Sequence, residues 1–87
     1  MSYTSDLIRK LRSTIGYNIH RLRAERRLTL SHLSCLTGVS VLLLDHYELG
    51  KNEIRLDEML KIACAMKVRF EELFVKNALG SVCRPRP

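Results

Sequence analysis

Three observations in the sequence predict an all-α fold. Apolar residues recur at intervals of three and four residues, the period of a helix with one buried face. Ser, Thr and Gly stand where such runs begin and end, as they do at helix caps. No segment alternates apolar and polar residues long enough to predict a strand. The 87 residues suffice for one domain with a single small core, and we expect five helices in it.

The first helix is predicted from an apolar stripe with a basic opposite face. The stripe consists of Ile8, Leu11, Ile15, Ile19 and Leu22. The opposite face carries Arg9, Lys10, Arg12, Arg21, Arg23, Arg26 and Arg27. Thr4 or Ser5, with Asp6, supplies the start signal. Because Gly16 weakens the middle of this helix, residues 5–13 form either a separate arm or its continuation.

Two short helices with a tight turn between them follow. The first is expected from Leu30 to Thr37, with Thr29 as its cap and Leu33 facing inward. Gly38 makes the turn, where a side chain would collide or strain the backbone. The second begins at Ser40 and stops at Gly50. This arrangement is the helix-turn-helix signature, whose second helix enters the major groove of DNA.

The last two helices complete the predicted core. The fourth has apolar residues at helical spacing and acidic residues near its positive end. These are Met59, Ile62, Ala63 and Met66, with Asp57 and Glu58. The fifth is short, from Phe70 to Val75, with Phe70, Leu73 and Phe74 facing in and Glu71 and Glu72 facing out.

The predicted elements divide the chain into three parts. Residues 1–13 are a helical extension, residues 14–76 the helix-turn-helix domain, and residues 77–87 a flexible tail. The tail lacks an apolar period and contains both prolines of the chain, which is typical of disordered ends.

The order and spacing of these residues resemble the lambda-repressor-like (Cro or XRE-type) helix-turn-helix family over residues 14–74. The matching positions are Ile15-Gly16, Ile19, Leu22-Arg23, Leu28-Thr29, Leu33-Ser34, Gly38-Val39-Ser40, Leu44, Tyr47-Glu48, Gly50-Lys51, Ile62-Ala63, Val68 and Phe70-Glu71-Glu72-Leu73. The resemblance implies a compact five-helix domain, here with an extended N-terminal helix or arm. It also implies a sequence-specific, DNA-binding transcriptional regulator that acts as a homodimer on double-stranded DNA.

The resemblance further implies which residues contact DNA. The start of the second helix contributes Thr29, Leu30 and Ser31. The recognition helix contributes Ser40, Val41, Leu42, Asp45 and His46. The loop after it contributes Lys51, Asn52 and Arg55 as phosphate contacts. Arg23 and Glu48 match a family pair that forms a salt bridge between the first helix and the end of the third.

The outward residues of the recognition helix depart from the family pattern. Val41, Leu42 and Leu43 are apolar where polar residues are usual, and an apolar side chain can contact only a thymine methyl. From residue 28 to residue 53 there is one Lys against three acidic residues, a net charge of −2. An alternative is therefore a protein-interaction module of the same fold, with a partner docked through Leu30, Leu42 and Leu49, and with Leu36 in the same exposed set. A recognition helix rotated or packed against the N-terminal arm is a further alternative.

Composition narrows the remaining function classes. A net charge of +6 suits a polyanionic partner. The apolar run at residues 41–44 is far too short to span a membrane, and no other run in the sequence approaches the required length. Three cysteines without metal-type spacing favour reduced thiols in a cytoplasmic protein, and His32 with Cys35 gives at most two ligands. We therefore expect no metal and no cofactor, and because no catalytic motif is present, no enzyme activity.

Overall fold

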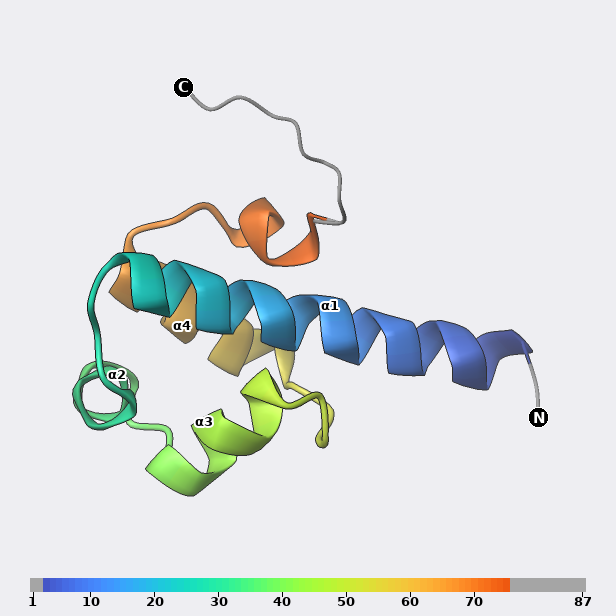
Figure 1. The fold of residues 1–87 in the computed structure, drawn as a ribbon, viewed down its shortest axis with the longest axis horizontal. Coiled ribbons are helices and arrows are strands. Elements are labelled where there is room, and N and C mark those ends of the chain that lie inside the picture. Colours follow the sequence, from blue (N-terminus) through green and yellow to red (C-terminus); the bar gives the residue numbers. More distant parts are fainter. Residues whose placement is uncertain (1–2, 76–87) are drawn as a thin grey trace.

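The computed structural model describes residues 3–75, and these fold as an all-α domain. The elements are α1 (Tyr3–Glu25), α2 (Leu30–Thr37), α3 (Val41–Glu48), α4 (Leu56–Met66) and a short 3-10 helix, η1 (Phe70–Phe74). Long α1 crosses the molecule, with α2 and α3 on one side and η1 on the other (Figure 1). The fifth predicted helix is thus a 3-10 helix. The tail predicted for residues 77–87 lies outside the described residues.

The helix α1 continues without a break through Gly16, so residues 5–13 extend it and do not form a separate arm. Gly16 is buried at the point where α1 meets the end of α3. A Cβ on Gly16 would lie 2.2 Å from the carbonyl oxygen of Tyr47 and 2.8 Å from that of Glu48. The residue that weakens the helix locally therefore permits close packing between two helices.

The apolar stripe of α1 is buried only in its second half. Ile15, Ile19 and Leu22 are in the core, whereas Ile8 and Leu11 are 42% and 47% exposed. The first half of α1 projects beyond the other helices (Figure 1). The N-terminal extension is therefore a helix whose apolar face is only partly covered within residues 3–75.

The core lies between α1, the α2–α3 pair and α4. Its buried apolar side chains are Ile15, Ile19, Leu22, Leu33, Val39, Leu44, Tyr47, Met59, Ile62, Ala63, Met66 and Leu73. Every residue predicted to face inward from α4 is in this set. From η1, Leu73 is fully buried, but Phe74 is 37% exposed, so its predicted inward position is wrong. Phe74 instead packs edge-to-face on Phe70, with ring centroids 5.1 Å apart.

A buried asparagine ties η1 to α1. Asn18 is fully buried, and its amide nitrogen donates to the carbonyl oxygens of Leu73 and Val75, both at 2.8 Å. Buried carbonyl groups need such partners, so the amide fixes the end of η1 against α1. Asn18 lies among the apolar residues of α1, three positions after Ile15 and four before Leu22. A polar residue inside an apolar stripe is the sequence signal for this role.

Candidate nucleic-acid interface

The helix-turn-helix is built from local capping interactions. The Thr29 hydroxyl accepts a hydrogen bond from the amide of His32 and begins α2. The Ser40 hydroxyl accepts one from the amide of Leu43 and begins α3. Between them Gly38 has φ +80°, the left-handed conformation that Gly adopts without strain, and a Cβ there would meet nothing within 4 Å. A side chain at position 38 would therefore strain the backbone, but it would not collide with other atoms.

The helix α3 is oriented by its two buried side chains. Leu44 and Tyr47 enter the core, and the Tyr47 hydroxyl donates to Glu58 at the start of α4. Burial and the Glu58 carboxylate raise the pKa of Tyr47, which keeps the phenol protonated as a donor. The opposite face, with Val41 40% and Leu42 66% exposed, is turned to solvent. The alternative in which α3 is rotated or packed against the N-terminal half of α1 is therefore wrong.

The other residues predicted to contact DNA have different degrees of exposure. Those on the surface are Thr29, Ser31, Ser40, Lys51, Asn52 and Arg55. Asp45 and His46, one turn after Val41 and Leu42, are half-buried. Arg55 Nε lies 3.2 Å from the Asp57 carboxylate, so part of its charge is already neutralised.

Two leucines predicted to be outward are not free surface residues. Leu30 is half-buried and packs on the core, so its predicted exposure is wrong. Its predicted contacts with DNA or with a protein partner stay predictions. Leu43 also packs on the core. The apolar surface of the α2–α3 pair therefore reduces to Leu36, Val41, Leu42 and Leu49.

Arg23 and Glu48 form an ion pair between α1 and α3. Arg23 Nε lies 2.6 Å from Glu48 Oε2, and the two side chains are 14% and 7% exposed. His20 Nδ1 lies 2.9 Å from the other carboxylate oxygen. Burial alone would raise the pKa of Glu48, but the hydrogen bonds from Arg23 and His20 outweigh it and hold that pKa below its ordinary value. Glu48 is therefore an ionised structural group that presents little negative charge to a ligand.

A second ion pair changes the charge of the same face. Arg12 of α1 lies 3.5 Å from Glu53, in the loop after α3. The net charge of residues 28–53 is −2 by sequence, and the two arginines that pair with Glu48 and Glu53 bring the sum to zero. The α2–α3 face is thus neutral in the folded chain, with Lys51 exposed on it.

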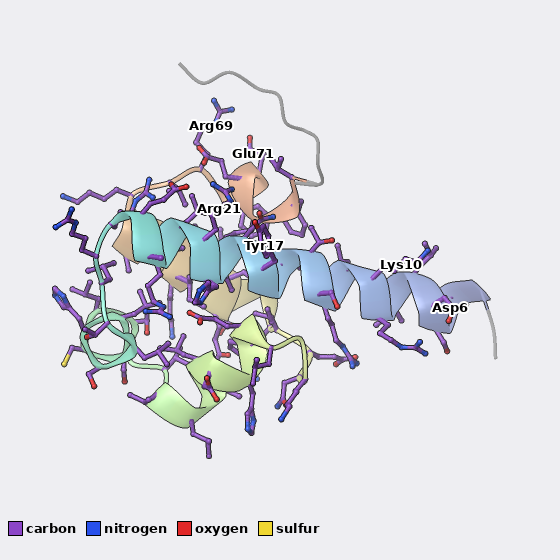
Figure 2. All side chains as sticks on the ribbon, in the orientation of Figure 1. Asp6, Lys10, Tyr17, Arg21, Arg69 and Glu71 are labelled. Carbon is purple, nitrogen blue, oxygen red and sulfur yellow. The ribbon has the colours of Figure 1, made fainter. Side chains whose placement is uncertain are left out.

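Much of the remaining positive charge lies elsewhere on the molecule. Figure 2 shows Lys10, Arg21 and Arg69 on the side of α1 away from α3. Arg26 acts within the fold, since its Nε donates to the carbonyl oxygen of Met66 at 2.7 Å. Among residues 3–75, no three His, Cys, Asp or Glu side chains converge as a metal site would require. In the same residues, no helix has the length and apolar character of a membrane span.

Comparison with known families decides what this arrangement is. Residues 18–78 match the model of the Cro/C1-type helix-turn-helix DNA-binding domain. The chain belongs to this family. The match begins within α1 and includes both helices of the motif with all of α4.

Two solved structures are similar to this chain. The restriction-modification controller protein C.AhdI from Aeromonas hydrophila is 27% identical with a TM-score of 0.70, over 72% of this chain and 96% of that one. An HTH_3 family transcriptional regulator from Vibrio cholerae is 30% identical with a TM-score of 0.74. That match covers 77% of this chain but 38% of the other, which is a longer protein. A comparison with curated protein sequences finds no match.

Proposed function

We propose that the protein is a sequence-specific transcriptional regulator of the XRE/Cro type that binds double-stranded DNA as a homodimer. The observation that carries the proposal is the orientation of α3. Its inner face is fixed by Leu44, Tyr47 and the Arg23–Glu48 pair, while its first turn faces solvent. A helix held in this way can enter the major groove without rearrangement. Both similar structures are named as regulators or controllers, which supports the same role.

In the proposed complex, three groups of residues contact DNA. Val41, Leu42, Asp45 and His46 face base edges, with Ser40 at the groove entrance. The amides in the first turn of α2 face a phosphate beside Thr29 and Ser31, because a helix N-terminus attracts anions. Lys51, Asn52 and Arg55 contact the backbone from the loop after α3. The pairing of Glu48 and Glu53 with arginines makes the face neutral. A neutral face does not repel phosphates, as the net negative charge of residues 28–53 alone would.

The homodimer is supported by the uncovered half of α1. Leu7, Ile8 and Leu11 are exposed along one face. Ile8 and Leu11 also line a groove of about 170 Å³, together with Ile54, Met59 and Phe74. A contiguous apolar surface of this kind favours association, and a symmetric pair is the commonest form of it. The proposal requires that this pair place its two α3 helices on one side of the duplex, because dimeric proteins of this type contact half-sites about one helical turn apart.

A second candidate function has one observation in its favour. Leu36, Leu42 and Leu49 are all exposed on the α2–α3 pair, as a surface that docks another protein would be. In this alternative the same fold is a protein-interaction module and α3 does not contact DNA. In either role the protein binds a macromolecule in the cytoplasm, and we propose no catalysis.

Fluorescence anisotropy distinguishes the two candidates. The full chain is titrated into labelled mixed-sequence duplexes and into the DNA upstream of its own gene, at low and moderate salt. The regulator predicts binding that weakens as salt rises, because each phosphate contact releases a counterion, and tighter binding to the upstream DNA. Absence of salt-dependent binding to any duplex would favour the protein-interaction module.

A further inference from the structure

The exposed side chains in the first turn of α3 are apolar, and few groups in the major groove of DNA are. Leu42 and Val41 are the most exposed residues of this turn, and the first residues of a recognition helix are those that contact base edges. Neither side chain can donate or accept a hydrogen bond. A favourable contact in the groove therefore has to be with an apolar group.

Only one methyl group is available on the major-groove edge of the four ordinary bases, and it is the C5 methyl of thymine. Apart from ring C–H groups, which offer little apolar surface, the other groups on these edges are hydrogen-bond donors or acceptors. Cytosine methylated at C5 carries a methyl at the same place on the pyrimidine ring. A 5-methylpyrimidine is thus the class of base that Val41 and Leu42 can recognise.

The rest of α3 restricts the base further. No Arg or Lys occurs in residues 41–48, so the bidentate contact to guanine that these side chains make is absent from this helix. Asp45 lies one turn after Val41 and Leu42, and an ionised carboxylate only accepts hydrogen bonds. In the groove its partners are the amino groups of adenine and cytosine. An A·T pair offers a methyl and an amino group together, and 5-methylcytosine carries both on one base.

We infer that Val41 and Leu42 recognise the 5-methyl groups of pyrimidines in the major groove, with Asp45 accepting from an adjacent amino group. The inference rests on the proposed DNA-binding function and names the feature of the DNA that provides its specificity. Each methyl covered by these side chains strengthens binding about fourfold, the factor expected for burying one such carbon. Specificity then comes from shape and apolar contact more than from paired hydrogen bonds.

The test starts from two selections with the full chain. One random duplex pool contains the four ordinary bases, and in the other every cytosine is 5-methylcytosine. The duplexes recovered are resynthesised with single methyl groups removed, by uracil in place of thymine or cytosine in place of 5-methylcytosine. Removing one half-site methyl should weaken binding about fourfold. Dependence on thymine in the first pool, or on 5-methylcytosine in the second, identifies the source of the methyl.

Variants assign the effect to α3. Leu42→Ala should bind the methylated and unmethylated duplexes within about 1.5-fold of each other, because the apolar contact is lost. Val41→Thr keeps the shape of the side chain but adds a hydroxyl. It should halve the preference for a methylated base at the position that Val41 contacts. Leu60→Ala, an equally conservative change at an exposed leucine of α4, should keep the full fourfold ratio.

Two results separate the inference from the function on which it rests. Salt-dependent DNA binding that is indifferent to every half-site methyl, in both pools, would overturn the inference and leave the regulator intact. The inference is equally overturned if Leu42→Ala and Val41→Thr both keep the full ratio. Failure to recover or bind any duplex would overturn the DNA-binding function itself.

Discussion

The guanidinium of Arg23 holds both oxygens of the Glu48 carboxylate, with Nε 2.6 Å from Oε2 and Nη2 3.0 Å from Oε1. The remaining Nη1 donates to the carbonyl oxygen of Leu28 at 2.8 Å. One side chain near the end of α1 thereby joins the end of α3 and the segment that leads into α2. Arg23 therefore links α1 to the helix-turn-helix at two points.

Breaking the pair should destabilise the fold. Arg23→Met leaves the largely buried Glu48 carboxylate without its main partner, so the free energy of unfolding should fall by about 3 kcal/mol, as for other buried pairs that lose one member. Urea unfolding followed by circular dichroism measures this. Glu25→Gln is the control, because the Arg21–Glu25 pair is exposed and should contribute less than about 0.5 kcal/mol. Equal losses in the two variants would contradict the structural role of Arg23.

The same carboxylate should make stability depend on pH. The folded state lowers the pKa of Glu48, so its stabilising contribution is complete above the ordinary Glu pKa of about 4.3 and is lost as pH falls through the lower folded value. Thermal unfolding from pH 6 to pH 3 should show this loss. In Glu48→Gln the slope in the acidic range should be smaller than in the wild type, and an unchanged slope would exclude Glu48 as its source.

Gly16 and Gly38 should respond differently to a methyl group. Gly16→Ala places a Cβ 2.2 Å from the Tyr47 carbonyl oxygen, and because both partners are backbone of packed helices, the cost should be about 2–3 kcal/mol. Gly38→Ala meets no atom within 4 Å and pays only for its positive φ, about 1 kcal/mol. Urea unfolding of both variants gives the comparison. A larger loss at Gly38 than at Gly16 would argue against the close approach of α1 and α3.

The two apolar surfaces should have separate roles. If α1 forms the dimer, Ile8→Asp places a charge in the interface and should reduce the mass in solution to that of a monomer, since an unpaired buried charge is costly. Leu42→Asp should leave the mass unchanged, because it lies on the DNA-binding surface. Analytical ultracentrifugation measures both. A mass that falls with Leu42→Asp and not with Ile8→Asp would support a protein-docking role for α3.

The parts of the fold that local chemistry controls could be predicted from the sequence. Thr29, Gly38 and Ser40 have capping or turn roles that depend on their own neighbours in the chain, so the sequence predicts the bounds of α2 and α3 within a residue or two. The spacing of Met59, Ile62, Ala63 and Met66 likewise determines the buried face of α4. The Arg23–Glu48 contact joins distant segments, and only the resemblance to a family pointed to it.

Other features depend on contacts that a linear pattern does not contain. The bonds from Asn18 to the end of η1 and from Tyr47 to Glu58 each join different elements. The close approach of α1 and α3 at Gly16 is also a tertiary effect. The sequence marks Gly16 as a weak point of the first helix, whereas in the fold the lack of a side chain there permits the packing. The predicted exposure of Leu30 is wrong for another reason. Leu30 lies three residues before buried Leu33 and so shares its face, but the family position suggested an outward side chain.

Whether the first turn of α3 faces DNA can be tested directly with one pair of variants. Leu42→Arg adds a positive charge at this turn, and Leu60→Arg adds the same charge at an exposed leucine of α4. If α3 enters the groove, Leu42→Arg should tighten binding to mixed-sequence duplexes and steepen the slope of log Kd against log salt by about one, as one new phosphate contact would. Leu60→Arg should leave that slope nearly unchanged. Equal effects of the two variants, or no salt-dependent binding by either, would contradict the placement of α3 in the groove.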